Sequence, residues 1–372
     1  MALRDTPPFR ADHVGSLLRP ASLLEARAAF ADGRLPAKDL RAAEDEAVAE
    51  AVRLQEDAGL RSATDGEFRR ESWNMDFLFA LDGVEKDTVS RTAQFRNARG
   101  AVSVERPALQ ITGKIGVSGT IFGDHFRFLR HTVSSATPKI SIPSPNMLAR
   151  QRDQDGSSLG PYSSAAELWA DMAAAYQAEI AGLADMGCTY LQLDDTSFSN
   201  LLDPGLRERL VASGADLDTE LRQRIGRINA ALAGRPAGMT VTTHICRGNY
   251  RSRWAAEGGY DAIAESLFNA LDVDGFFLEY DDERSGGFEP LRHVPAGKLV
   301  VLGLVTTKRP ELEQPSTLKR RVDEASRYIN PDQLCISPQC GFSSTLEGNE
   351  LTIGDERAKL ALIVETADAL WG

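Results

Sequence analysis

A histidine and a cysteine lie two residues apart after the apolar stretch 238–241, in the order Thr242-Thr243-His244-Ile245-Cys246. The preceding residues have the β-branched character of a buried strand. Because a strand turns successive side chains to opposite faces, we expect His244 and Cys246 to point the same way. An imidazole and a thiolate on one face are ligands of the kind that Zn²⁺ binds in proteins. The pair therefore predicts half of a zinc site.

Two further apolar stretches end on metal-ligand types. Residues 275–279 close on the carboxylate of Glu279, and residues 334–340 close on the thiol of Cys340. If these stretches are neighbouring strands, their ends converge on one site. Structural zinc sites usually hold their ligands in closely spaced pairs such as CxxC, so the wide separation here favours a site built across a cleft. The predicted ligands are His244, Cys246, Glu279 and Cys340.

The fourth ligand is open to alternatives. Tyr280-Asp281-Asp282-Glu283 follows directly and offers three more carboxylates, so one of these, or water, is an alternative to Glu279. A purely structural zinc site is a second alternative. The two remaining cysteines, Cys188 and Cys335, are expected to be small core residues, as lone strand cysteines usually are.

The elements that must position these ligands alternate between strands and helices. Eight such strands predict an α/β fold, a (β/α)8 barrel. The predicted strands are 9–18, which runs into a Gly-Ser turn, 61–68, 139–143, 189–194, 239–246, 275–279, 298–305 and 334–337. The predicted helices are 36–59, 163–187, 216–232, 260–271, 316–329 and 350–371, with Gly59 and Ser316 as capping residues. Pro20 opens a further helical stretch, which is interrupted near Gly33.

One region interrupts this alternation. Residues of about 83–135 contain strand-like pieces and few helix signals, so we predict an inserted β-hairpin region. The chain shows no internal repeat, no low-complexity segment and no linker rich enough to divide it. We therefore expect a single barrel domain over residues 1–372.

Polar residues follow nearly every predicted strand. Active sites of (β/α)8 barrels lie at the C-terminal ends of the strands, which makes these positions candidates for function. They are Ser16, Glu67, Asp194, His244, Cys246, Glu279, Lys308 and Cys340.

The overall composition excludes several classes of protein. A net charge of −12 argues against general binding to nucleic acid or to anionic membranes, which requires a basic surface. No apolar run reaches the roughly 18 residues of a membrane helix, and residues 1–5 carry no apolar signal core. Four scattered cysteines form no disulfide framework, so we expect a reduced, cytoplasmic protein. The oligomeric state stays open, a homo-oligomer included.

Six motifs resemble the catalytic half of cobalamin-independent methionine synthase, over nearly the whole chain. They are HVGSLLRP from His13, DGEF from Asp65, LQLDD from Leu191, HIC from His244, FFLEY from Phe276 and SPQCGF from Ser337. The resemblance implies a (β/α)8 barrel. It implies zinc bound by His244, Cys246, Glu279 and Cys340, and homocysteine bound by Gly15, Ser16, Glu67 and Asp194. Without the family's duplicated N-terminal half, the chain is similar to the short relatives, which include epoxyalkane:coenzyme M transferases.

The residues are suited to the chemistry that this resemblance implies. Zinc lowers the pKa of a bound thiol, and the thiolate is the nucleophile. Glu67 and Asp194 suit the ammonium group of an amino-acid thiol, while Ser16, or Arg19, suits its carboxylate. We expect methylation of homocysteine to methionine through a zinc-bound thiolate. The alternative for Glu67 and Asp194 is pairing with a structural arginine such as Arg69 or Arg70.

The predicted donor site differs from that of the full-length family. Lys308, in Thr306-Thr307-Lys308-Arg309, stands where the family has a histidine that protonates the departing folate. Pro143 stands at or near a tryptophan that packs on the pterin. Lys308 is therefore the candidate catalytic acid, or else binds an anionic group of another donor. We expect methyl-folate to be a poor donor, and the sequence leaves the donor unidentified.

Two other functions remain open from the sequence. One is a zinc-dependent alkyl transferase for another small thiol such as coenzyme M, which would need a sulfonate pocket of Arg or Lys in place of an acidic pair. The other is a non-enzymatic zinc- or thiol-binding protein, which the open arrangement of ligands disfavours.

Overall fold

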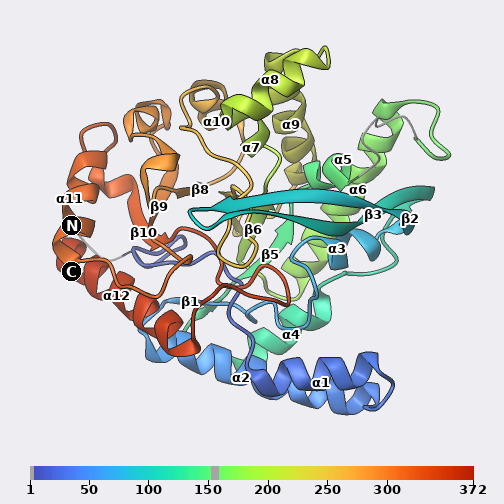
Figure 1. The fold of residues 1–372 in the computed structure, drawn as a ribbon, viewed down its shortest axis with the longest axis horizontal. Coiled ribbons are helices and arrows are strands. Elements are labelled where there is room, and N and C mark those ends of the chain that lie inside the picture. The colour runs from blue at the N-terminus through green and yellow to red at the C-terminus, as the bar shows by residue number, and fades with distance from the viewer. Residues whose placement is uncertain (1–3, 152–158) are drawn as a thin grey trace.

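Six parallel strands form the centre of this computed structural model, which describes residues 4–151 and 159–372 (Figure 1). Part of the chain start, where we expected no signal core, lies outside these ranges. The strands follow the order β10-β9-β8-β7-β6-β5, and each pairs in parallel with its neighbours. Their bounds are β5 Ile140–Pro143, β6 Tyr190–Asp195, β7 Thr240–Ile245, β8 Gly275–Glu279, β9 Leu299–Val305 and β10 Leu334–Pro338.

The first two predicted strands lie at the two edges of this sheet with little regular pairing. Ala11 forms a parallel bridge with Ile336 of β10, and β1 (Ser62–Ala63) pairs with β4 (Thr137–Pro138) directly before β5. The extent predicted for the strands over 9–18 and 61–68 is therefore wrong, whereas the predicted Gly-Ser turn is present as a bend at Gly15. The backbone leaves the extended conformation at Gly15 (φ 136°) and Gly66 (φ 65°), two positive φ values that glycine tolerates. The fold is of the predicted (β/α)8 barrel type.

The longer helices lie where the sequence predicts them, with shorter ends. Three of these helices begin with a side-chain N-cap. Ser164, Asp216 and Thr352 each accept a backbone N–H of the first helical turn. Ser316 is not a cap, because Pro315 already occupies the first helical turn. The helices are α1 Ala21–Ala31, α2 Ala37–Asp57, α6 Ala165–Asp185, α9 Leu217–Leu232, α10 Ala264–Ala270, α11 Pro315–Ala325 and α12 Ile353–Trp371. No helix within the described ranges is long and apolar enough to cross a membrane.

Short helices join these elements. They are α3 Met75–Phe79, α4 Gly123–Thr132, α5 Asn146–Gln151, α7 Ser199–Leu202 and α8 Pro204–Ala212. The sequence analysis predicted none of them, because four to ten residues are too few to show a helical period.

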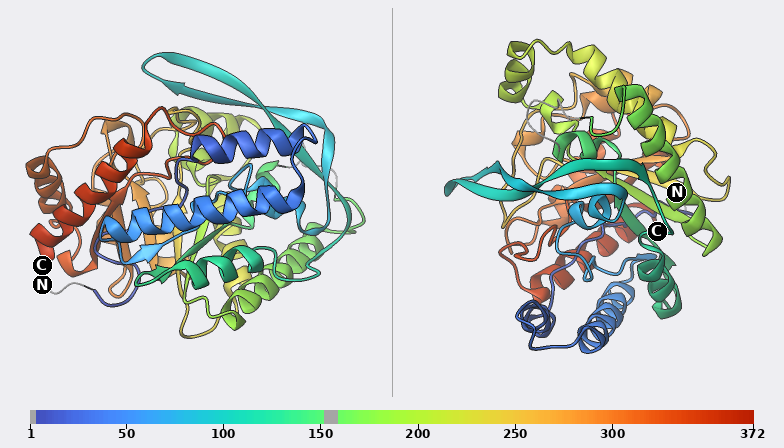
Figure 2. Two further views of the ribbon diagram at one scale, coloured as in Figure 1. Left: turned by 90° about the horizontal axis from the view of Figure 1, so that it is seen from below. Right: turned by 90° about the vertical axis from the view of Figure 1, so that its right-hand side faces the viewer.

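The inserted region contains a long antiparallel hairpin, β2 (Asp82–Asn97) with β3 (Gly100–Gly116), followed by α4. The hairpin crosses the face of the strand ring as an arm (Figures 1 and 2). Near its tip, Arg96 exchanges two backbone hydrogen bonds with Trp254 (2.8 and 3.0 Å), and its guanidinium pairs with Asp203 and Glu257. These contacts fix the arm to the loop that follows β7.

Successive side chains of a strand point to opposite faces, and the apolar residues on the two faces form two separate clusters. Phe276 and Leu278 of β8 belong to the large cluster that packs against the helices. Phe277 belongs to a small cluster with Val14, Val301 and Cys335. Because residues two apart share a face, Glu279 projects on the same side as Phe277.

Glu356 of α12 is buried and accepts the backbone N–H of Leu18 (2.8 Å). Burial raises the pKa of its carboxyl from 4.5 to about 8. Between these values the folded protein keeps a proton that the unfolded chain has lost, so this group lowers folding stability as pH rises. We expect Glu356→Gln, which keeps an acceptor, to be stabilised relative to wild type by on the order of 2 kcal/mol at about pH 8, and little at about pH 4.

Urea unfolding at several pH values measures this difference. The exposed Glu365→Gln variant on the same helix is the control and should follow the wild type. A stability difference between wild type and Glu356→Gln that does not change with pH would contradict the assignment.

Candidate metal centre and substrate cavity

Four potential metal ligands from three strand ends meet at one point. One ligand atom from each of the four residues lies within 4.8 Å of all the others, and all four residues are buried. They are His244, Cys246, Glu279 and Cys340. Cys246 directly follows β7, Glu279 ends β8 and Cys340 lies two residues after β10, so parallel pairing of adjacent strands brings them together.

The chemistry of this group fits a cation. Both ring nitrogens of His244 lack a hydrogen-bond partner among the described residues, although the side chain is buried. The Sγ atoms of Cys246 and Cys340 are 3.6 Å apart. Buried polar atoms normally have a hydrogen-bond partner. A metal ion bound beside the two thiols and the carboxylate would be the partner that the His244 ring lacks. Nitrogen, sulfur and carboxylate ligands are the set that zinc prefers.

Glu279 is held in a fixed orientation. Its Oε1 accepts the backbone N–H of Arg247 (2.9 Å), and its Oε2 accepts from Gln339 Nε2 (3.0 Å). Burial alone would raise the pKa of this carboxyl, but the nearby cations, Arg284 first and then Lys308, hold it below its ordinary value. Glu279 is therefore ionised. The alternative ligand Asp281 instead pairs with Arg284 (2.8 Å).

The two thiols share a hydrogen bond. That bond from Cys246, together with the charges of His244 and Lys308, holds the pKa of the Cys340 thiol well below its ordinary value, against the effect of burial. The same bond and burial raise the pKa of Cys246. The thiolate form of Cys340, the form that binds metals, is thus favoured.

A cavity of about 1060 Å³ opens above this group. His244, Cys246 and Cys340 line it, whereas Glu279 lies behind them. The hairpin arm supplies part of its wall, including Arg91, Phe95 and Arg106. Its volume is at the upper end of the range for small-molecule sites, which leaves room for a donor beside a small thiol.

The structure brings three of the predicted substrate residues into this cavity, Ser16, Glu67 and Asp194. Asp194 stands directly opposite His244 in the pairing of β6 with β7, and its Oδ1 accepts from Gln192 (2.8 Å). Burial, opposed chiefly by His244, raises the pKa of the Asp194 carboxyl to about 7. Gly15 does not line the cavity. Its carbonyl oxygen accepts from Thr64 Oγ1 (2.6 Å).

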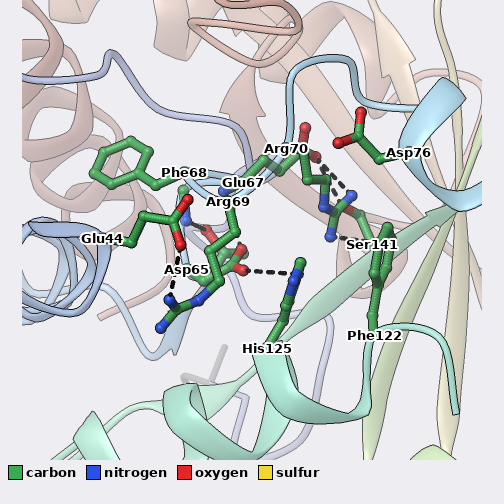
Figure 3. Close-up of polar contacts among 12 residues, drawn as sticks. Glu44, Asp65, Glu67, Phe68, Arg69, Arg70, Asp76, Phe122, His125 and Ser141 are labelled. Carbon is green, nitrogen blue, oxygen red and sulfur yellow. Dashed lines mark hydrogen bonds and ion pairs between the residues drawn. The ribbon is translucent and has the colours of Figure 1, made fainter. Parts of the chain in front are cut away.

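Glu67 lies among polar partners from β5 and from its own loop (Figure 3). Its Oε1 accepts from Ser141 Oγ (2.8 Å) and lies 3.6 Å from an amino group of Arg70. The alternative considered above, an ion pair between Glu67 and a structural arginine, is thus present at Oε1. Oε2 is buried without a partner among the described residues. Arg19, considered above for a substrate carboxylate, donates instead to Ser343 and to backbone carbonyls.

Lys308 lies behind the cavity wall. It is buried, its Nζ donates to Asn249 Oδ1 (2.6 Å), and Asn249 lines the cavity in its place. Pro143 is also absent from the lining, and its carbonyl oxygen accepts from Tyr176 (2.8 Å).

The sequence analysis missed Asn249 and Ser141. Neither belongs to a motif, and a lone polar residue beside a strand has many roles.

Comparison with known proteins agrees with this fold. The model of a family described as cobalamin-independent synthase, catalytic domain, matches residues 160–368. The chain is 47% identical over 366 residues to uncharacterized protein YxjH of Bacillus subtilis (strain 168), covering 98% of this chain and 95% of that protein. It is 25% identical over 332 residues to a methionine synthase of Thermococcus kodakarensis, covering 88% and 85%.

Solved structures show the same relationship. A Listeria monocytogenes protein assigned as a vitamin-B12 independent methionine synthase superposes with a TM-score of 0.78 at 36% identity, over 99% of this chain and 100% of that chain. The α/β barrel of this chain, with a histidine, two cysteines and a glutamate at its strand ends, has the fold of a catalytic domain. The chain belongs to the cobalamin-independent methionine synthase family.

Proposed function

We propose that the chain is a zinc-dependent thiol S-methyltransferase that converts homocysteine to methionine. The observation that carries this proposal is the position of the four-ligand group at the base of a cavity that Glu67 and Asp194 also line. Membership of a family named for methionine synthesis supports the same reaction.

Zinc bound by His244, Cys246, Glu279 and Cys340 would lower the pKa of the substrate thiol and keep it a thiolate near pH 7. The chain's own residues then place the substrate. The unpartnered Oε2 of Glu67 and the carboxylate of Asp194 accept hydrogen bonds from the homocysteine ammonium group. Ser16, which lines the same cavity, is placed to bind its carboxylate. This orientation holds the sulfur toward the methyl donor.

The acidic pair also sets the preferred class of thiol. A thiol with a sulfonate, such as coenzyme M, would bring its anion toward Glu67 and Asp194, and like charges repel across a buried site. The ammonium group of an amino-acid thiol is attracted there instead. We therefore expect zinc-loaded protein to bind homocysteine more tightly than coenzyme M. The reverse preference would favour the alternative, a transferase for another small thiol.

Removing either carboxylate should weaken homocysteine binding. We expect Glu67→Gln and Asp194→Asn each to cost about 1.5–3 kcal/mol, because each loses a hydrogen bond to a charged group. Calorimetric titration of zinc-loaded protein measures the affinity. Glu71→Gln is the matched control, since this exposed carboxylate lines the same cavity. Unchanged homocysteine affinity in both test variants would refute the ammonium site.

A further inference from the structure

Glu67 adopts a left-handed backbone conformation, with φ of 61°. For a residue with a side chain, this conformation costs about 1–3 kcal/mol and persists only where surrounding groups hold it. The Glu67 N–H donates to Oδ1 of Asp65 (2.9 Å). Its carbonyl oxygen accepts from Arg19 (2.8 Å) and from the N–H of Arg70 (3.0 Å). Asp65 is therefore the acceptor that fixes the amide side of this turn.

The second oxygen of Asp65 faces the insertion. Oδ2 lies 3.9 Å from Nδ1 of His125 in α4, and neither atom has a hydrogen-bond partner among the described residues. Burial outweighs the attraction of Asp65 and lowers the pKa of His125 to about 4, so the imidazole is neutral at pH 7. Arg70 and His125 outweigh burial and lower the pKa of Asp65. A neutral imidazole thus faces an ionised carboxylate, with Nδ1 the ring nitrogen nearest to Oδ2.

A stack of planar groups connects the same histidine to the Glu67 side chain (Figure 3). The His125 ring lies on Phe122, with centroids 5.0 Å apart and planes 12° from parallel. The Arg70 guanidinium covers the Phe122 ring at 4.1 Å and lies 3.6 Å from Glu67 Oε1. His125 therefore reaches Glu67 by two routes, through Asp65 to its backbone and through Phe122 and Arg70 to its carboxylate.

We infer that Asp65 and His125 are positioning residues that hold Glu67 for the substrate. They fix its backbone, and the partners of Oε1 fix its side chain, so that Oε2 stays without a protein partner on a residue that lines the cavity. The insertion thereby contributes to substrate recognition through α4 as well as through the hairpin arm. The inference rests on the proposed function, since it takes Glu67 as the acceptor of an ammonium group.

The test removes the imidazole and measures homocysteine binding to zinc-loaded protein. We expect His125→Leu to weaken binding about tenfold, an effect of the size seen when partners that orient a ligand group are removed. Zinc content should stay unchanged, because the metal ligands lie on other strands. His125→Asn, whose amide can place a donor near the Nδ1 position, should recover most of the affinity. His131→Leu is the control, an exposed histidine on the same helix.

A double-mutant cycle separates positioning from general support of the fold. In a Glu67→Gln background, His125→Leu should add less than about a twofold loss, because both changes act on one interaction. Full affinity in His125→Leu, or losses that multiply in the double variant, would overturn the inference. If His125→Leu does not fold, Asp65→Asn carries the same expectations.

Failure of the proposed function gives a different result. In that case wild-type protein loaded with zinc does not bind homocysteine at all. Crystal structures of the wild type and of His125→Leu, or of Asp65→Asn, then decide the inference alone. Loss of the left-handed conformation at Glu67 in the variant would support it, and retention of that conformation would overturn it.

Discussion

Replacing either cysteine of the candidate centre by serine is expected to remove most of the bound zinc. Wild-type protein should carry about one zinc per chain, as a single four-ligand site implies. Cys246→Ser and Cys340→Ser each remove a thiolate, and a serine hydroxyl at neutral pH is a poor zinc ligand. Activity should fall with the metal, because the substrate thiol then stays protonated. Elemental analysis of purified protein measures the zinc content.

The control for this experiment is Cys188→Ser, because Cys188 is buried but lies outside the four-ligand group. It should retain zinc. The site variants should keep the circular dichroism of the wild type, since the barrel core does not depend on these side chains. Full zinc in both Cys246→Ser and Cys340→Ser would exclude the proposed centre.

The second large effect concerns the methyl donor. Methyl transfer from a tertiary amine such as methyltetrahydrofolate needs a general acid, whose help is worth about 10²–10⁴-fold. A lysine is ordinarily a much weaker acid at pH 7 than a histidine. Lys308 also donates to Asn249 and does not line the cavity. We therefore expect methyltetrahydrofolate to be a poor donor, by about 10²-fold or more relative to an activated donor.

Donors whose leaving group needs no proton should react faster. Methylcobalamin and a methyl sulfonium are suitable probes, each assayed with homocysteine and the same zinc-loaded protein. Pro143 adds to the expectation, because it has no aromatic face and does not line the cavity. If the folate supports turnover on the order of 1 s⁻¹ while the activated donors do not, the assignment of Lys308 and Pro143 is wrong.

The ligand group could be predicted because its members obey strand alternation. His244 and Cys246 share a face by their spacing, and Glu279 ends β8, the strand that follows β7 in the chain and pairs with it. Cys340 follows β10, which β9 separates from β8. Parallel strands that follow one another are usually neighbours in space, so the ends of β7 to β10 lie at one edge of the sheet. The length of the first two strands was harder to predict. Apolar residues continue past Gly15 and Gly66, although the backbone turns at both glycines.

Of the groups around Glu67, Arg70 could be predicted as an alternative partner, but Ser141 and His125 could not, because they come from separate parts of the chain. Ser141 lies on β5, Arg70 follows Glu67 by three residues, and His125 belongs to the insertion. Which face of the hairpin meets the cavity depends on where its tip is fixed. That position is set by Arg96 and Trp254, which pair across a long sequence separation. Local patterns carry no information about such contacts.

X-ray absorption at the zinc edge, with and without homocysteine, tests the central claim most directly. The free protein should show about two sulfur ligands with nitrogen and oxygen completing the shell, as the four residues require. Addition of homocysteine should add one sulfur to the zinc shell. An unchanged shell at saturating homocysteine, or a zinc shell without cysteine sulfur, would contradict the account.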